Sequence, residues 1–178
     1  VHIPADSPEA AVQALQQGVQ RLQTQVDFAR LLPAIGLGTP GLVDMHTGVI
    51  KTAVDVGWFE VPIRAMVEEK LGIHTFVANR SKVGALAEYW VSAEQGIQEI
   101  IYISIGTGVA AGIVHEGKLY LGVNSSAGEL GHVTILPNGP LCRCGNRGCL
   151  QALVSEAAIA DRARTRLREQ RDSLLWEL

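Results

Sequence analysis

One short segment decides how this chain is interpreted: Gly128-Glu-Leu-Gly-His132, residues 133–141, and then Cys142-Arg-Cys-Gly-Asn-Arg-Gly-Cys149-Leu-Gln151. It contains His132, Cys142, Cys144 and Cys149, which include all three cysteines of the sequence. Thiolates and imidazoles are ligands that Zn²⁺ prefers, and a structural zinc site closes with four ligands in a tetrahedron. The segment therefore predicts a zinc site with these four side chains as ligands.

The glycines between the cysteines favour this interpretation. Gly145 and Gly148 allow the backbone to turn sharply enough to bring Cys144 and Cys149 to one ion. The alternative is a disulfide with one spare thiol. The odd number of cysteines and the Cys-x-Cys spacing argue against that alternative.

Length and composition limit the possible functions. With 178 residues, 47% of them hydrophobic, the chain can form one large domain or two small lobes with a core. A net charge of −3 gives no reason to expect nucleic-acid binding by this chain unaided. No apolar run approaches the ~18 residues that would span a membrane. Clustered, reduced cysteines point to the cytoplasm. Because the chain begins at Val1 and stops within a helical pattern, we expect a fragment of a longer protein.

The first part of the chain predicts a helix, a strand and a loop. Ser7-Pro8 is a helix start, followed by an apolar stripe at Val12, Leu15, Val19, Leu22 and Val26. Residues 31–38 are expected to form a buried strand that ends in a glycine-rich loop, residues 36–41. Such a loop lets the backbone approach a ligand closely, although a plain turn into the hairpin of residues 42–50 explains it equally well.

A second helix is expected over residues 61–71 and a strand over residues 74–78, leading into Asn79-Arg80-Ser81. Ser81 is then expected to cap a third helix, whose apolar positions are Val83, Leu86, Ala87, Trp90 and Val91. Polar residues between a strand and a helix N-terminus are a usual location of a ligand site in α/β proteins. The alternative for Asn79 is a side-chain cap.

Two further strands are expected over residues 98–104 and 109–114, joined by Gly106, Thr107 and Gly108. The bare backbone amides of such a hairpin can bind phosphate oxygens. Many hairpins, however, carry glycine only for its backbone conformation.

The order of these motifs is more specific than any one of them. The chain carries Gly38-Thr-Pro-Gly41, Asn79 after a strand, Ser104-Ile-Gly-Thr-Gly-Val-Ala-Ala-Gly-Ile-Val114, Gly117-Lys-Leu-Tyr-Leu-Gly122, Ala127-Gly-Glu-Leu-Gly-His132 and Cys142-x-Cys-Gly-x-x-Gly-Cys149. In this order the motifs resemble the ROK family, named for repressors, open reading frames and kinases. The resemblance covers about residues 1–165.

The resemblance implies an actin-like, ribonuclease H-like α/β fold with two lobes around a sugar cleft. It places the rest of an N-terminal lobe in about residues 1–95 and the start of a C-terminal lobe in about residues 96–178, with the zinc loop at 132–149. Family members are commonly homo-oligomers. Their kinases bind a hexose through residues matched by Asn79, Glu129 and His132, with Gly41 in the adjacent loop. The zinc ion then orients the imidazole and need not do chemistry.

Two departures from the kinase pattern affect the predicted activity. Directly after the asparagine, the kinases carry an aspartate that acts as general base, and this chain has Arg80. A guanidinium remains protonated and offers no acceptor, so Arg80 cannot be that base. Where the kinases place a further sugar-binding glutamate, this chain has Gln151, which can still form hydrogen bonds but carries no charge.

Three functions fit these residues. The first is a non-catalytic, sugar-binding effector domain of a transcriptional regulator, with a helix-turn-helix for DNA upstream of this chain. The second is an ATP-dependent hexose or N-acetylhexosamine kinase that uses another base. The third is a degenerate enzyme retained for assembly.

The charge change also bears on the ligand. Arg80 and Gln151 in place of two acids make the expected sugar cleft about three charge units more positive than the kinase pattern. An anionic effector such as a sugar phosphate or sugar acid would fit, with Arg80 as its partner. The alternative is that Arg80 pairs with Glu129 or points to solvent.

Overall fold

We obtained a computed structural model of the chain, and it describes residues 7–25 and 32–169. The chain forms two compact units. The first unit comprises Val1–Val83 and Leu121–Ser126, and the second comprises Gly84–Tyr120 and Ala127–Leu178. Each unit is described separately. The lobe boundary expected near residue 95 concerns the whole protein and stays a prediction.

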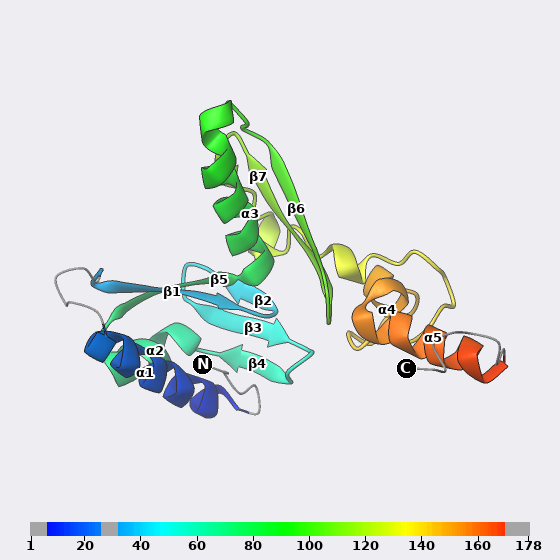
Figure 1. Cartoon of the computed structure of the whole chain (residues 1–178), viewed down its shortest axis with the longest axis horizontal. Coiled ribbons are helices and arrows are strands. Elements are labelled where there is room, and N and C mark those ends of the chain that lie inside the picture. The colour runs from blue at the N-terminus through cyan, green and yellow to red at the C-terminus, as the bar shows by residue number, and fades with distance from the viewer. Residues whose placement is uncertain (1–6, 26–31, 170–178) are drawn as a thin grey trace. The chain divides into compact units, whose positions relative to one another are not determined.

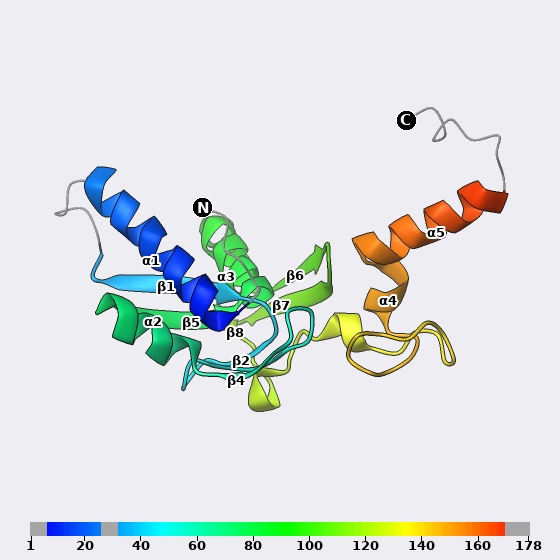
Figure 2. The same ribbon diagram turned by 90° about the horizontal axis from the view of Figure 1, so that it is seen from below.

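The first unit begins with helix α1 (Pro8–Gln25), where the hydroxyl of Ser7 accepts a hydrogen bond from the Ala10 amide at 3.1 Å. Helices α1 and α2 (Ile63–Leu71) pack together, and Figure 2 shows them side by side across a pair of strands. The expected stripe of α1 becomes less covered along the helix, because Val12 is buried, Leu15 is half-buried against the core and Leu22 is 54% exposed. Its last position, Val26, lies outside the described residues.

That pair of strands is parallel: β1 (Ala34–Thr39) lies beside β5 (His74–Asn79), which places Thr39 opposite Asn79 (Figure 1). A separate antiparallel sheet contains β2 (Leu42–Asp44), β3 (Val49–Ala53) and β4 (Trp58–Val61), and so confirms the expected hairpin. The core of this unit is aliphatic and includes Val43, Ile50, Val61, Val67 and Val77.

Two element boundaries differ from the prediction. The first strand begins at Ala34, directly after Pro33, rather than near residue 31, which is itself outside the described residues. The second helix begins at Ile63 because Val61 is the last residue of β4 and Pro62 stands at the N-cap. Proline has no N–H to continue a strand ladder but suits a helix start, which explains both shifts.

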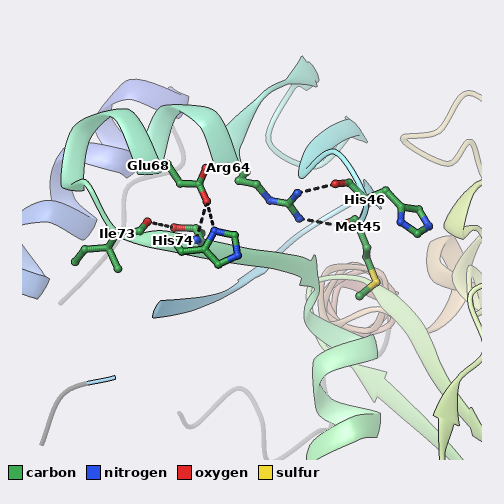
Figure 3. A network of polar contacts seen from close by, with 7 residues as sticks. Met45, His46, Arg64, Glu68, Ile73 and His74 are labelled. Carbon is green, nitrogen blue, oxygen red and sulfur yellow. Dashed lines mark hydrogen bonds and ion pairs between the residues drawn. The ribbon is translucent and has the colours of Figure 1, made fainter. Parts of the chain in front are cut away.

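Arg64 holds the turn of the first hairpin against α2 (Figure 3). Its guanidinium donates to the carbonyl oxygens of His46 at 2.6 Å and Met45 at 2.8 Å. Its backbone amide donates to the carbonyl of Gly48 at 3.2 Å. Gly48 has a φ of +73°, and a Cβ there would overlap the side chain of Arg64. The turn therefore requires glycine for both conformation and space.

The other end of α2 is tied to β5. One carboxylate oxygen of Glu68 accepts the amide of Thr75 at 2.8 Å and lies 2.9 Å from Nδ1 of His74 (Figure 3). Gly72, with a φ of +66°, ends the helix in a left-handed conformation. Helix α2 is thus joined at both ends to the strands of the first unit.

The second unit contains most of α3 (Arg80–Ser92), followed by an antiparallel sheet of β6 (Ile100–Ile105), β7 (Val109–His115) and β8 (Lys118–Leu119) (Figure 1). The expected hairpin is confirmed. Helices α4 (Leu150–Val154) and α5 (Glu156–Glu169) follow the cysteine segment. No helix among the described residues combines the length and the apolar character needed to cross a membrane.

The predicted third helix is confirmed, but several of its apolar positions lie on the exposed face. Val83, Trp90 and Val91 are 43%, 67% and 74% exposed, whereas Lys82 and Ala85 are fully buried. Periodicity identifies an apolar face but not the neighbour that covers it. In this helix the buried face carries Lys82, whose ammonium group donates a hydrogen bond.

Candidate functional site

The four predicted metal ligands form one cluster in the second unit. The ligand atoms of His132, Cys142, Cys144 and Cys149 all lie within 4.8 Å of one another. The Sγ atoms of Cys144 and Cys149 are 3.7 Å apart, and Sγ of Cys142 is 3.8 Å from Nδ1 of His132. A tetrahedral site with Zn–S bonds of about 2.3 Å would separate two sulfurs by roughly 3.8 Å. The cluster could therefore hold a metal ion, and its dimensions fit Zn²⁺.

The loop between these ligands is built from backbone hydrogen bonds. The Cys142 amide donates to the carbonyl of Asn146 at 2.7 Å, and the Gly145 amide donates to the carbonyl of Cys142 at 2.9 Å. Gly148 has a φ of +69°, and a Cβ there would overlap the carbonyl of Leu136. The sequence assigned Gly145 and Gly148 to sharp turns, and both have positive φ.

The thiols of the cluster influence one another's protonation. Burial, and after it the neighbouring Cys144 and Cys142, raise the pKa of the Cys149 thiol to about 12. Burial also opposes ionisation of Cys144, but a backbone hydrogen bond at Asn146 and the other two thiols outweigh it and lower its pKa. Three close thiols without a cation do not ionise together. A metal ion would displace these protons on binding.

Glu129 and His132 are positioned by close packing of their segment on β7. The carbonyl of Gly128 accepts the Ala111 amide at 2.7 Å. A Cβ at Gly128 would overlap the carbonyl of Ala111, and one at Gly131 would overlap that of Val109. This role was not predicted from the sequence, although the Gly-x-x-Gly spacing of Gly128 and Gly131 on either side of Glu129 was a signal for it.

Gln151 also faces β7. It is 7% exposed, and its Oε1 accepts the amide of Val109 at 3.1 Å. The predicted sugar-contacting glutamine is thus held by the first residue of the strand that follows Gly106, Thr107 and Gly108.

The backbone of the Gly106 to Gly108 turn already takes part in two hydrogen bonds. The amide of Gly106 donates to the carbonyl of Gly108 at 2.9 Å, and the carbonyl of Gly106 accepts the Glu156 amide at 2.9 Å. The turn is therefore tied to the start of α5. The amide of Gly106 is already used, so phosphate binding by this turn stays a prediction.

Asn79 caps helix α3, as the alternative interpretation had it. Its Oδ1 accepts the amide of Ser81 at 2.8 Å, and its Nδ2 donates to the carbonyl of Gly41 at 2.7 Å. Helix α3 begins at Arg80, so the prediction that Ser81 is the cap was wrong. Gly41 has a φ of +80° and packs on Thr52 and Ala53, which also supports the plain-turn interpretation of its glycine.

Arg80 is an exposed residue at the start of α3. The first turn of α3 carries no acidic residue. Cγ of the Arg80 side chain lies beside Gly38, 3.5 Å from where a Cβ of that glycine would be. Within the described part of the first unit, no carboxylate pairs with Arg80. Asn79, Arg80 and Gly41 therefore gather in the first unit, whereas Glu129, His132 and Gln151 gather in the second.

The family model described as the ROK family matches residues 1–176. The chain belongs to the ROK family. Two curated ROK relatives differ in function. A glucokinase from Halalkalibacterium halodurans is 41% identical over 145 residues, which make up 81% of this chain and 44% of that protein. A xylose repressor from Bacillus subtilis is 34% identical over 166 residues, 93% of this chain and 43% of the repressor.

A solved ROK structure gives the fold. The ROK family glucokinase from Streptomyces griseus, in complex with glucose and AMPPNP, matches with a TM-score of 0.85 and 31% identity, over 97% of this chain and 54% of that one. This ROK chain therefore has the actin-like, ribonuclease H-like fold expected from its motifs. It spans less than half the length of the two curated relatives named above.

Proposed function

We propose that this ROK chain is the sugar-binding effector region of a transcriptional regulator and does not transfer phosphate. In the whole protein a helix-turn-helix outside this chain would bind DNA, and the regulator would act as a homo-oligomer. A sugar that binds one arrangement of the protein more tightly than another would change the affinity for DNA.

Arg80 carries this proposal. ROK kinases are expected to place their general base at this position, directly after the asparagine. A guanidinium cannot accept the proton, and the first turn of α3 offers no carboxylate instead. Loss of a general base lowers a rate by about 10² to 10⁴. The xylose repressors among the relatives support a regulator as the setting for such a substitution.

We further propose that Asn79, Glu129, His132 and Gln151 contact the sugar, with Gly41 in the adjoining loop, and that the cysteine cluster holds Zn²⁺. Nδ1 of His132 is the ring nitrogen in the cluster, so Nε2 is the one that would reach a sugar hydroxyl. The ion would hold the imidazole ring in one orientation and would take no part in a reaction.

An ATP-dependent sugar kinase is the second candidate. The observation that favours it is the 41% identity to a glucokinase, which exceeds the identity to the xylose repressor. This candidate requires a base other than residue 80.

Titration calorimetry of the full-length protein tests the proposal. The ligands would be D-glucose, D-xylose, N-acetylglucosamine, glucose 6-phosphate and N-acetylglucosamine 6-phosphate. Each compound that binds would then be assayed for ATP turnover. Saturable binding without phosphoryl transfer is expected. Turnover of ~1 to 100 per second, as in ordinary kinases, would refute the regulator and favour the kinase.

A further inference from the structure

Lys82 is a buried lysine in the first turn of α3. It is 2% exposed and is the largest of the fully buried side chains among the described residues. Lysine is almost never fully buried without a partner, because removing an ammonium group from water is costly. Its Nζ donates to the carbonyl oxygen of Ser125 at 2.8 Å.

Ser125 belongs to a segment that departs from its neighbours in the chain. Leu121–Ser126 forms part of the first unit, whereas the residues on both sides, Gly84–Tyr120 and Ala127–Leu178, form the second. The chain thus enters the first unit for a short distance and then returns to the second. Lys82 binds the segment near the point of return.

The backbone of this segment is strained. Asn124 has a φ of 54° and Ser125 a φ of 59°, so two consecutive residues other than glycine adopt the left-handed conformation. Such a conformation persists only where the surroundings impose it. Ser125 is 8% exposed, and its carbonyl is held by the buried ammonium of Lys82. The burial of Ser125 and its hydrogen bond from Lys82 are what hold this segment in the left-handed conformation.

The segment leads directly to the predicted sugar contacts. Gly128, which follows closely, is bonded to β7 through the Ala111 amide at 2.7 Å. We propose that Lys82 is a positioning residue for the sugar site: its hydrogen bond to Ser125 fixes the conformation of Leu121–Ser126, the segment that leads into Gly128, Glu129 and His132. This inference rests on the proposed sugar-binding function.

The variant Lys82→Met in the full-length protein tests the proposal. Methionine keeps an unbranched apolar side chain but cannot donate to the Ser125 carbonyl. We expect affinity for D-xylose and D-glucose, measured by calorimetry below the melting temperature, to fall by roughly 10- to 100-fold. Zinc content should not change. The matched control is Lys70→Met, at an exposed lysine in the same unit, which should bind as the wild type does.

A rescue variant separates positioning from general stability. Glycine adopts a φ near +59° without strain, so Ser125→Gly should help the segment keep its conformation without Lys82. We expect Lys82→Met with Ser125→Gly to regain part of the lost affinity. A folded Lys82→Met protein with wild-type affinity would refute the proposal.

Amide hydrogen exchange tests the proposal even if Lys82→Met does not fold or the wild type binds no sugar. In the wild-type protein, the Ser126 amide, which donates to the Val123 carbonyl at 3.1 Å, should exchange slowly, and in Lys82→Met rapidly. Rapid exchange in the wild type would overturn the proposal even if Lys82→Met does not fold. This measurement needs no sugar, so a wild type that binds no sugar would refute only the proposed function.

Discussion

At the start of α3, the charge of Arg80 can be tested through the ligand it would bind. If the effector is anionic, Arg80→Ala removes a charge-assisted hydrogen bond, worth about 1.5 to 3 kcal/mol. We expect affinity for glucose 6-phosphate to fall by about 10- to 100-fold and affinity for glucose to change little. Calorimetry with both ligands measures the two effects.

Arg166→Ala on α5 is the control, because Arg166 is exposed and far along the chain from the proposed contacts. Equal affinities of Arg80→Ala and the wild type for both ligands would show that Arg80 does not contact the ligand. The hypothesis that the effector is anionic would then be lost.

The turn at Gly48 offers a test of local packing. Gly48→Ala places a Cβ both at a φ of +73° and against the side chain of Arg64, and should lower the free energy of unfolding by about 2 to 4 kcal/mol. Gly57→Ala is the matched control, since Gly57 has a φ of +70° but no atom within 4 Å of its Cβ position. It should cost only about 1 kcal/mol. Equal losses in urea unfolding would contradict the role given to Arg64.

At this scale the sequence predicted best where chemistry is local. The clustering of His132, Cys142, Cys144 and Cys149 could be predicted because the four residues lie in one segment and their residue types suggest a metal site. The roles of Lys82 and Arg64 could not be found, because their partners Ser125 and Met45 are distant in the chain and only the folded backbone brings the two together. Asn79 was recognised as a candidate cap, but the helix start was placed one residue too late.

Among the elements, the β6–β7 hairpin carries an ion pair whose pH dependence has a definite sign. Nδ1 of His115 lies 2.8 Å from Glu99, and this hydrogen bond raises the pKa of His115 above its ordinary 6.5. Protonated His115 therefore stabilises the fold below pH 6.5, and this contribution is lost as the pH rises through the raised pKa. Both groups are exposed, so the effect is small.

An NMR titration of the His115 ring should show this raised pKa, and Glu99→Gln should return it towards 6.5. His46, an exposed histidine in the other hairpin, serves as the internal reference within each spectrum. An unchanged His115 titration in Glu99→Gln would contradict the assignment of the shift to this pair.

The sequence predicted the existence of elements better than their surroundings. The positions of glycine and proline predicted both hairpins and the order of helices and strands, because these residues affect the backbone only within a few positions. The apolar positions of α3 were correctly predicted to be helical, but the pattern did not reveal that Trp90 and Val91 are exposed. Burial of a helix face depends on packing against other elements, which periodicity does not contain.

For the whole molecule, if the cluster holds Zn²⁺ as proposed, removal of the ion should affect the two units differently. The first unit has its own hydrophobic core that contains none of the cysteines, whereas the cluster lies in the second unit. We expect a strong chelator to lower the melting of the second unit and leave that of the first nearly unchanged. A loss of about 2 kcal/mol would lower a small domain's melting temperature by roughly 10 °C.

Differential scanning calorimetry of the full-length protein with and without chelator measures this separation, and added Zn²⁺ should reverse it. Cys149→Ser is the matched variant, because it removes one buried ligand and should melt alike with or without chelator. A uniform shift of both transitions would contradict independent stability of the first unit.

Strand β6 bears on how the isolated chain behaves in solution. Ile101, Ile103 and Ile105 are 68%, 52% and 62% exposed, and among the described strands β6 has a neighbour on one side only. An apolar strand with an open row of backbone donors and acceptors is a template for pairing with another molecule. Light scattering of this chain alone should therefore show aggregation that increases with concentration.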